Sequence, residues 1–199
     1  MGYILEYVPW VFTFLFTSRI LLPFDADTNN KLSSLITSLT LGLVSQFGPV
    51  LTAQRLLLAY ILSDSFLKTY TGFAFDIAVH HGLTLVLIYS TQNRPETSYL
   101  IKDLMLMEFT TPFLYLSLIL RKLKIQKTLM YASFTIALCL WPIFRLFVPL
   151  SVAVEALEYD YVGAYATFGL FILQVYWYCV LIYNAWKMCQ RPKTTILHA

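Results

Sequence analysis

Six ionisable side chains lie within stretches of sequence that are otherwise apolar. They are Asp64, Asp76, His80, His81, Glu108 and Arg145. A charged residue at the centre of a bilayer costs about 2.5–3.5 kcal/mol on insertion scales, so such residues turn inward and pair with one another. Carboxylate, imidazole and guanidinium groups gathered in this way could carry out acid–base chemistry or bind a polar head group. We therefore expect them to form one polar centre.

The segment 75–91 carries three of these groups. Asp76 and His80 are four residues apart and would share a helix face, so the carboxylate could hold the imidazole in one tautomer and raise its basicity. His81 lies about 100° further round the helix. One histidine should therefore face the polar centre and the other a neighbouring helix, and the spacing does not decide which is which.

A second polar group follows later in the chain. Glu108 and Thr111 are three residues apart and would share a helix face, with Pro112 expected to kink the helix there. Arg145 supplies the positive charge that several carboxylates would need. These residues could instead serve only to fasten helices together, as buried polar pairs do in membranes. For the paired histidines we favour a functional role, because packing explains neither.

Other kinds of reaction centre fit the sequence less well. The third histidine, His198, is in the C-terminal tail, so no metal is expected. A mixed site of His80, Asp76 and Glu108 is the zinc arrangement that remains conceivable. The chain has no Gly-x-Ser-x-Gly element of the kind that serine hydrolases use. No cofactor is expected.

The elements that position these residues are expected to be membrane-spanning helices. Of the 199 residues, 58% are hydrophobic and 13% are charged, which is too few charges for a soluble domain of this size. A helix needs about 20 mostly apolar residues to cross the hydrocarbon. The candidate spans are 3–22, 32–51, 54–70, 75–91, 98–120, 127–150 and 161–187. The predicted fold class is thus all-α integral membrane, with a single domain over 1–199.

Local sequence features predict where the second span ends and how the chain is oriented in the membrane. Gly48 and Pro49 are expected to break or end the second span. The segment 121–127 and the C-terminal tail are basic, whereas the loop between the last two spans is acidic. Because cytosolic loops carry the excess of Lys and Arg, we expect the C-terminus to be cytosolic.

The order of these residues resembles the TLC domain family of multi-spanning membrane proteins. That family includes ceramide synthases and translocating-chain-associated proteins, and the resemblance runs over about 54–190. The matching elements are Tyr60 to Asp64, His80 and His81 with Thr84, Glu108 to Pro112, Arg145, and Gln174 to Trp177.

The resemblance implies a bundle of about seven transmembrane helices, six of them ringing a lipid-accessible cavity. In ceramide synthases the double histidine lies at the reaction centre, where an imidazole attacks an acyl-CoA and passes the acyl group to a sphingoid amine. By this analogy the nucleophile would be His80 or His81 and the orienting base Asp76 or Glu108. The resemblance also implies a lipid-binding polar centre made of Asp64, Thr84, Thr111, Arg145, Gln174 and Trp177.

One feature departs from the synthases. Their signature continues with a His-Asp pair and a Ser-Asp pair one helix later, where this chain has Met107–Glu108 and then Thr110–Thr111. Nothing replaces that histidine. The chain is therefore closer to the small non-synthase members of the family.

Three functions are consistent with these patterns. The first is a TLC-type protein that binds or handles a fatty-acyl or sphingoid lipid in membrane lipid homeostasis, in the endoplasmic reticulum or a connected endomembrane. The second is an acyl-CoA-dependent N-acyltransferase, with acyl-CoA as co-substrate. The third is a trafficking or translocation helper in which the charges are structural. The net charge of +3 is small and gives no reason to expect a nucleic-acid partner.

Overall fold

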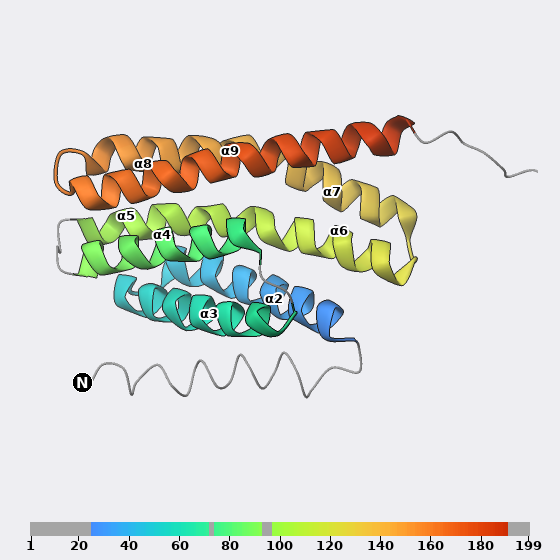
Figure 1. Cartoon of the computed structure of the whole chain (residues 1–199), viewed down its shortest axis with the longest axis horizontal. Coiled ribbons are helices and arrows are strands. Elements are labelled where there is room, and N and C mark those ends of the chain that lie inside the picture. The colour runs from blue at the N-terminus through green and yellow to red at the C-terminus, as the bar shows by residue number, and fades with distance from the viewer. Residues whose placement is uncertain (1–24, 72–73, 93–96, 191–199) are drawn as a thin grey trace, which may run out of the picture.

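The computed structural model describes residues 25–71, 74–92 and 97–190, and the regular secondary structure in these ranges is helical (Figure 1). The predicted first span, 3–22, lies outside the described residues. The elements are α2 (Ala26–Phe47), α3 (Val50–Thr71), α4 (Phe75–Gln92), α5 (Ser98–Met105), the 3₁₀ helix η2 (Leu106–Thr110), α6 (Thr111–Leu123), α7 (Lys127–Trp141), the π-helix η3 (Pro142–Phe147), α8 (Val148–Ala156) and α9 (Tyr161–Gln190).

The predicted helix over 32–51 is wrong at both ends, because α2 begins at Ala26 and ends at Phe47. Asp25 caps its first turn, and Oδ1 of that residue accepts hydrogen bonds from two backbone N–H groups at 3.1 Å each. Gly48 and Pro49 separate α2 from α3, as the sequence predicts. A proline within a continuous helix would lack the backbone donor that the helix needs.

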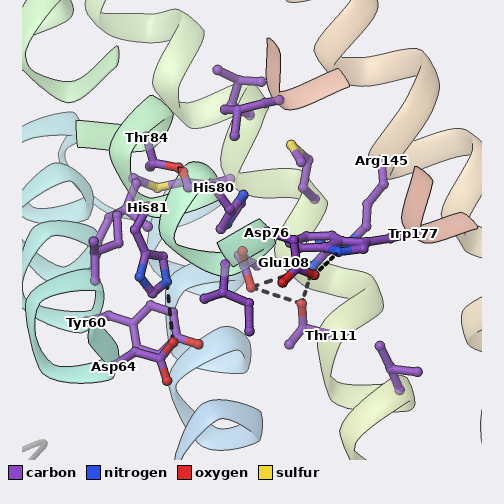
Figure 2. A pocket seen from close by; sticks show the side chains of 18 of the residues that line it. Tyr60, Asp64, Asp76, His80, His81, Thr84, Glu108, Thr111, Arg145 and Trp177 are labelled. Atoms are coloured by element: carbon purple, nitrogen blue, oxygen red, sulfur yellow. Dashed lines mark hydrogen bonds and ion pairs between the residues drawn. The ribbon is translucent and has the colours of Figure 1, made fainter. Parts of the chain in front are cut away.

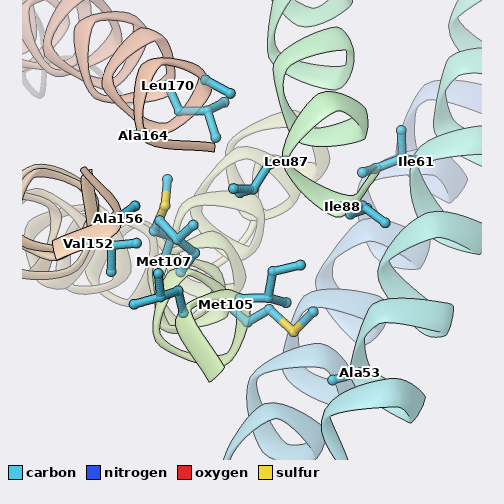
Figure 3. Packing of buried hydrophobic residues seen from close by; sticks show 14 residues of the cluster. Ala53, Ile61, Leu87, Ile88, Met105, Met107, Val152, Ala156, Ala164 and Leu170 are labelled. Carbon is cyan, nitrogen blue, oxygen red and sulfur yellow. The ribbon is translucent and has the colours of Figure 1, made fainter. Parts of the chain in front are cut away.

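The run formed by α5, η2 and α6 lies at the centre of the helix bundle (Figure 1). α5 packs against α2, α3, α4 and α8, while α6 packs against α2 and α7. α9 packs along α4 and α8. The buried apolar side chains of these helices form one cluster, which includes Ile61, Leu87, Met105, Val152 and Leu170 (Figure 3).

α4 and α9 approach each other closely at Gly163. A Cβ atom at this position would lie 2.6 Å from Oδ2 of Asp160 and 3.1 Å from Oγ of Ser90, so the contact has no space for a side chain. Ala166 and Thr167 continue the buried small face of α9. Small residues let membrane helices pack backbone to backbone, and here they bring two helices that carry site residues together.

Three of the described helical runs are long and apolar enough to cross a membrane, namely Tyr99–Leu123, Lys127–Ala156 and Tyr161–Gln190. They support an integral membrane protein, although they are fewer than the seven spans that the sequence predicts. α4 is shorter and carries Asp76, His80 and His81. These polar residues lower its mean hydropathy.

Charged side chains join the start of α2 to the end of α6. Lys122 Nζ donates to Oδ1 of Asp25 at 2.5 Å and to Oδ2 of Asp27 at 2.7 Å, and Lys31 also pairs with Asp27. The hydrogen bond from Lys122 holds the pKa of the Asp25 carboxyl well below its usual range. Because these groups are exposed, the ion pairs are weak and sensitive to salt.

Candidate functional site

A pocket of about 360 Å³ lies within the bundle, between α3, α4, α9 and the central run of α5, η2 and α6 (Figure 2). The predicted site residues that line it are Asp64, Asp76, His80, His81, Thr84, Glu108, Thr111, Arg145 and Trp177. Gln174 is not among the lining residues and is fully buried behind it. The fold therefore brings together side chains that are more than 100 residues apart in sequence, such as Asp76 and Trp177.

His81 is held on both sides by α3. Its Nε2 lies 3.3 Å from Oδ2 of Asp64, and its Nδ1 lies 2.7 Å from Oγ of Ser65. His81 and Asp64 are each only 7% exposed. The family resemblance predicts Asp76 or Glu108 as the orienting carboxylate, whereas the structure places Asp64 beside His81.

His80 points toward α9 rather than α3. Its ring centroid lies 5.4 Å from that of Trp177, with an angle of 56° between the ring planes. The Nε1 group of Trp177 donates a hydrogen bond to Oδ2 of Asp76 at 2.7 Å. Asp76, at the start of α4, is thus oriented by α9, and both histidines line the pocket.

Arg145 is the buried cation of the pocket. Its Nε donates to Oγ1 of Thr110 at 2.5 Å, its Nη2 to Oγ1 of Thr111, and its Nη1 to Oε1 of Gln174 at 3.2 Å. The guanidinium carbon also lies 4.6 Å from the ring centroid of Trp141, a cation–π distance. Each guanidinium nitrogen therefore binds a protein side chain. Arg145 belongs to the π-helix η3, a local widening of the kind that often marks functional sites.

Glu108 is positioned by the 3₁₀ helix η2. Side chains three residues apart eclipse one another in a 3₁₀ helix, and Oγ1 of Thr111 donates to Oε2 of Glu108 at 3.0 Å. Pro112 follows in the first turn of α6 and has no N–H for the carbonyl of Glu108, which accepts instead from the backbone of Thr111. The expected irregularity at Pro112 is therefore present, as a tightened turn. Arg145 Nη2 lies 4.0 Å from Oε2 of Glu108.

Ser65, Ser34 and Tyr115 are polar residues of the site that the sequence analysis does not predict. Ser65 contacts His81, and Ser34 lies close to Tyr60 and Tyr115, both of which line the pocket. The adjacency of Ser65 to Asp64 was an available signal. Ser34 is one of several hydroxyl side chains in the predicted span 32–51, and its spacing does not distinguish it from the others.

The formal charge of the pocket is negative. Its lining contains three carboxylates, Asp64, Asp76 and Glu108, and one guanidinium, Arg145. With neutral imidazoles the net charge is two negative units. Among the described residues, no three His, Cys, Asp or Glu side chains lie close enough together to hold a metal ion. His80, Asp76 and Glu108, the residues of the mixed zinc site considered above, do not form such a group.

Comparison with known proteins identifies the family. The TLC domain model matches residues 50–190, a range that includes every predicted site residue. The chain belongs to the TLC domain family, a family of membrane proteins, as its sequence motifs predict. No curated protein and no solved structure matches it. The closer affinity to the non-synthase members stays a prediction.

Proposed function

We propose that this TLC domain protein binds a membrane lipid whose head group carries a positively charged amine. The observation that carries this proposal is the charge of the pocket, in which Asp64, Asp76 and Glu108 face Arg145. An excess of carboxylates in a site of low dielectric attracts a cation and repels an anion. A fatty-acid or phosphate head group would meet unfavourable charge in the same place.

The hydrogen bonds of Arg145 support the preference for a cationic head group. Its three guanidinium nitrogens already donate to Thr110, Thr111 and Gln174. Three of the five guanidinium N–H donors are thus taken up by protein side chains, which fixes the orientation of the group. Arg145 therefore acts as a fixed part of the wall, and a cationic ligand does not compete for it.

Two carboxylates are oriented to receive an ammonium group. Asp76 is fixed through Oδ2 by Trp177, and Glu108 through Oε2 by Thr111. These two hydrogen bonds use Oδ2 of Asp76 and Oε2 of Glu108, so we assign the ammonium group to Oδ1 and Oε1. An ammonium group has three N–H donors, and hydrogen bonds between charged groups are the strong ones.

The rest of the pocket suits an alkyl chain. Its apolar lining includes Leu57, Ile61, Leu114, Leu118 and Leu181. These side chains come from α3, α6 and α9. A pocket with an apolar wall and a few oriented polar groups is the usual form of a small-molecule site, so an amphiphile fits it better than a soluble metabolite.

Lipid extraction from the purified protein tests the proposal. After detergent exchange, wild type and Glu158→Gln should retain a long-chain amine that mass spectrometry detects, and Glu108→Gln should lose it. Glu158 is an exposed residue outside the pocket, so its variant is the matched control. Retention of a fatty acid, or equal retention of the amine by Glu108→Gln, would contradict the proposal.

The same sample separates binding from the acyltransferase alternative. An acyltransferase that works through His80 or His81 would carry a fatty-acyl group on the intact protein, and that mass would disappear in the double alanine variant. The lipid-binding proposal expects no covalent adduct. A trafficking helper would be indifferent to both histidines and sensitive to changes in 121–127.

We also propose that the protein lies in the endoplasmic reticulum or a connected membrane, with its C-terminus in the cytosol. The basic residues of 121–127 support this orientation. An impermeant maleimide should label Gln126→Cys in intact microsomes in a background without the native cysteines. Glu158→Cys should react only after permeabilisation, and the opposite pattern would reverse the orientation.

A further inference from the structure

Both ring nitrogens of His81 contact polar side chains of α3. Asp64 Oδ2 lies 3.3 Å from Nε2 and Ser65 Oγ lies 2.7 Å from Nδ1 (Figure 2 shows the pair with Asp64). Asp64 and Ser65 are consecutive residues, so one turn of α3 holds the imidazole at both ends. His81 lies on α4, and these contacts also fix the register between the two helices.

The chemistry of these partners selects one tautomer. An ionised carboxylate can only accept hydrogen bonds, so the proton of the neutral imidazole belongs on Nε2, facing Asp64. Nδ1 is then an acceptor, and the Ser65 hydroxyl is the group that donates to it. The tautomer with the proton on Nδ1 would place the Nε2 lone pair against a carboxylate.

We infer that Ser65 is a positioning residue that fixes His81 in the Nε2–H tautomer, so that His81 orients Asp64 and offers no lone pair to a ligand. The histidine that contacts a bound ligand is then His80, which lines the pocket beside Trp177. This assignment rests on the proposed function only in taking the pocket as the ligand site. The sequence alone does not decide which histidine contacts the ligand. The inference assigns this role to His80 and gives His81 a positioning role.

The three side chains have the composition of a Ser–His–Asp triad, but their setting favours orientation over nucleophilic attack. Ser65 is not among the described residues that line the pocket. It also lies inside α3, where backbone N–H groups bond along the helix and are not available as an oxyanion hole. A substrate carbonyl in the pocket would therefore meet neither the nucleophile nor the donors that a triad needs.

Nitrogen NMR of the histidine rings tests the tautomer directly. The chain has three histidines, so ¹⁵N-histidine labelling gives a small spectrum, and His80→Gln and His81→Gln assign it. Without ligand, the wild-type His81 ring should show a protonated Nε2 and an unprotonated Nδ1. Ser65→Ala should shift the tautomer ratio about fivefold toward Nδ1–H, the effect of one lost hydrogen bond. Ser65→Thr keeps the hydroxyl and should restore the wild-type spectrum.

Ser63→Ala is the matched control, because Ser63 is a buried serine of the same helix whose hydroxyl donates to the carbonyl of Ala59. It should leave the His81 signals unchanged. A wild-type spectrum with Nδ1–H, or an unchanged spectrum in Ser65→Ala, would overturn the inference. So would a covalent adduct of a fluorophosphonate probe on Ser65. These measurements need no lipid, so they test the tautomer independently of amine binding. The wild-type spectrum is informative even where a variant does not fold.

Discussion

Trp177 and Asp76 are 101 residues apart in sequence and share a hydrogen bond of 2.7 Å between Nε1 and Oδ2. The bond joins α9 to the first turn of α4. The same indole ring borders His80. Trp177 therefore orients the carboxylate of Asp76 and contacts the imidazole of His80. These contacts give a physical role to the family motif that ends at Trp177.

Replacing Trp177 by Phe should keep most of the ring contact and remove the donor. We expect the free energy of unfolding to fall by about 1–2 kcal/mol, because a hydrogen bond to a charged group is lost. Chemical unfolding in detergent measures it. Trp186→Phe is the control, since Trp186 is an exposed residue of the same helix and should change stability by less than about 0.5 kcal/mol. Equal effects of the two variants would contradict the assigned role.

Arg145→Met should destabilise the protein by about 3–5 kcal/mol, because it leaves Glu108 without its cation and removes the donor to Thr110, Thr111 and Gln174. Adding Glu108→Gln to this variant should cost less than the two single losses together, since the uncompensated charge is then absent. Thermal unfolding of the four proteins gives the coupling. Additive losses, or an equal loss from the exposed Arg121→Met, would show that Arg145 is not bound as described.

Hydropathy and helix-breaking residues predict the approximate positions of many of the helices. Gly48 and Pro49 were located as a break because neither residue favours a continuous helix. The predicted start of α2 at residue 32 is too late, because Asp25 and the polar residues after it are not typical of a membrane span. They belong instead to a capped helix end that is tied to Lys122 of α6.

The sequence predicts which residues belong to the site better than it predicts which of them contact one another. Spacing along one helix favoured Asp76 as the partner of His80, but the carboxylate beside His81 comes from α3, in the residue Asp64. That contact depends on the register between α3 and α4. The periodicity within either helix does not specify this register. The π-helix that carries Arg145 begins at Pro142, and the sequence analysis did not predict it.

The link between α2 and α6 should depend on pH in a defined direction. The pKa of Asp25 is lower in the folded chain than its usual value of 3.8, so its contribution to stability is present above that value and is lost as the pH falls through the folded-state pKa. Asp25→Asn keeps a helix cap and removes the charge. Its deficit in melting temperature should be constant from about pH 8 to 5 and shrink below about pH 4. A deficit that grew on acidification would contradict the ion pair with Lys122.

The central claim is the charge preference of the pocket, and the most direct measurement is a competition between a long-chain amine and a fatty acid of the same chain length. Purified wild-type protein should bind the amine at least about tenfold more tightly, as expected for one retained charge-assisted hydrogen bond. Glu108→Gln should remove most of that preference, and Glu158→Gln should keep it. Tighter binding of the fatty acid by the wild-type protein would contradict the account.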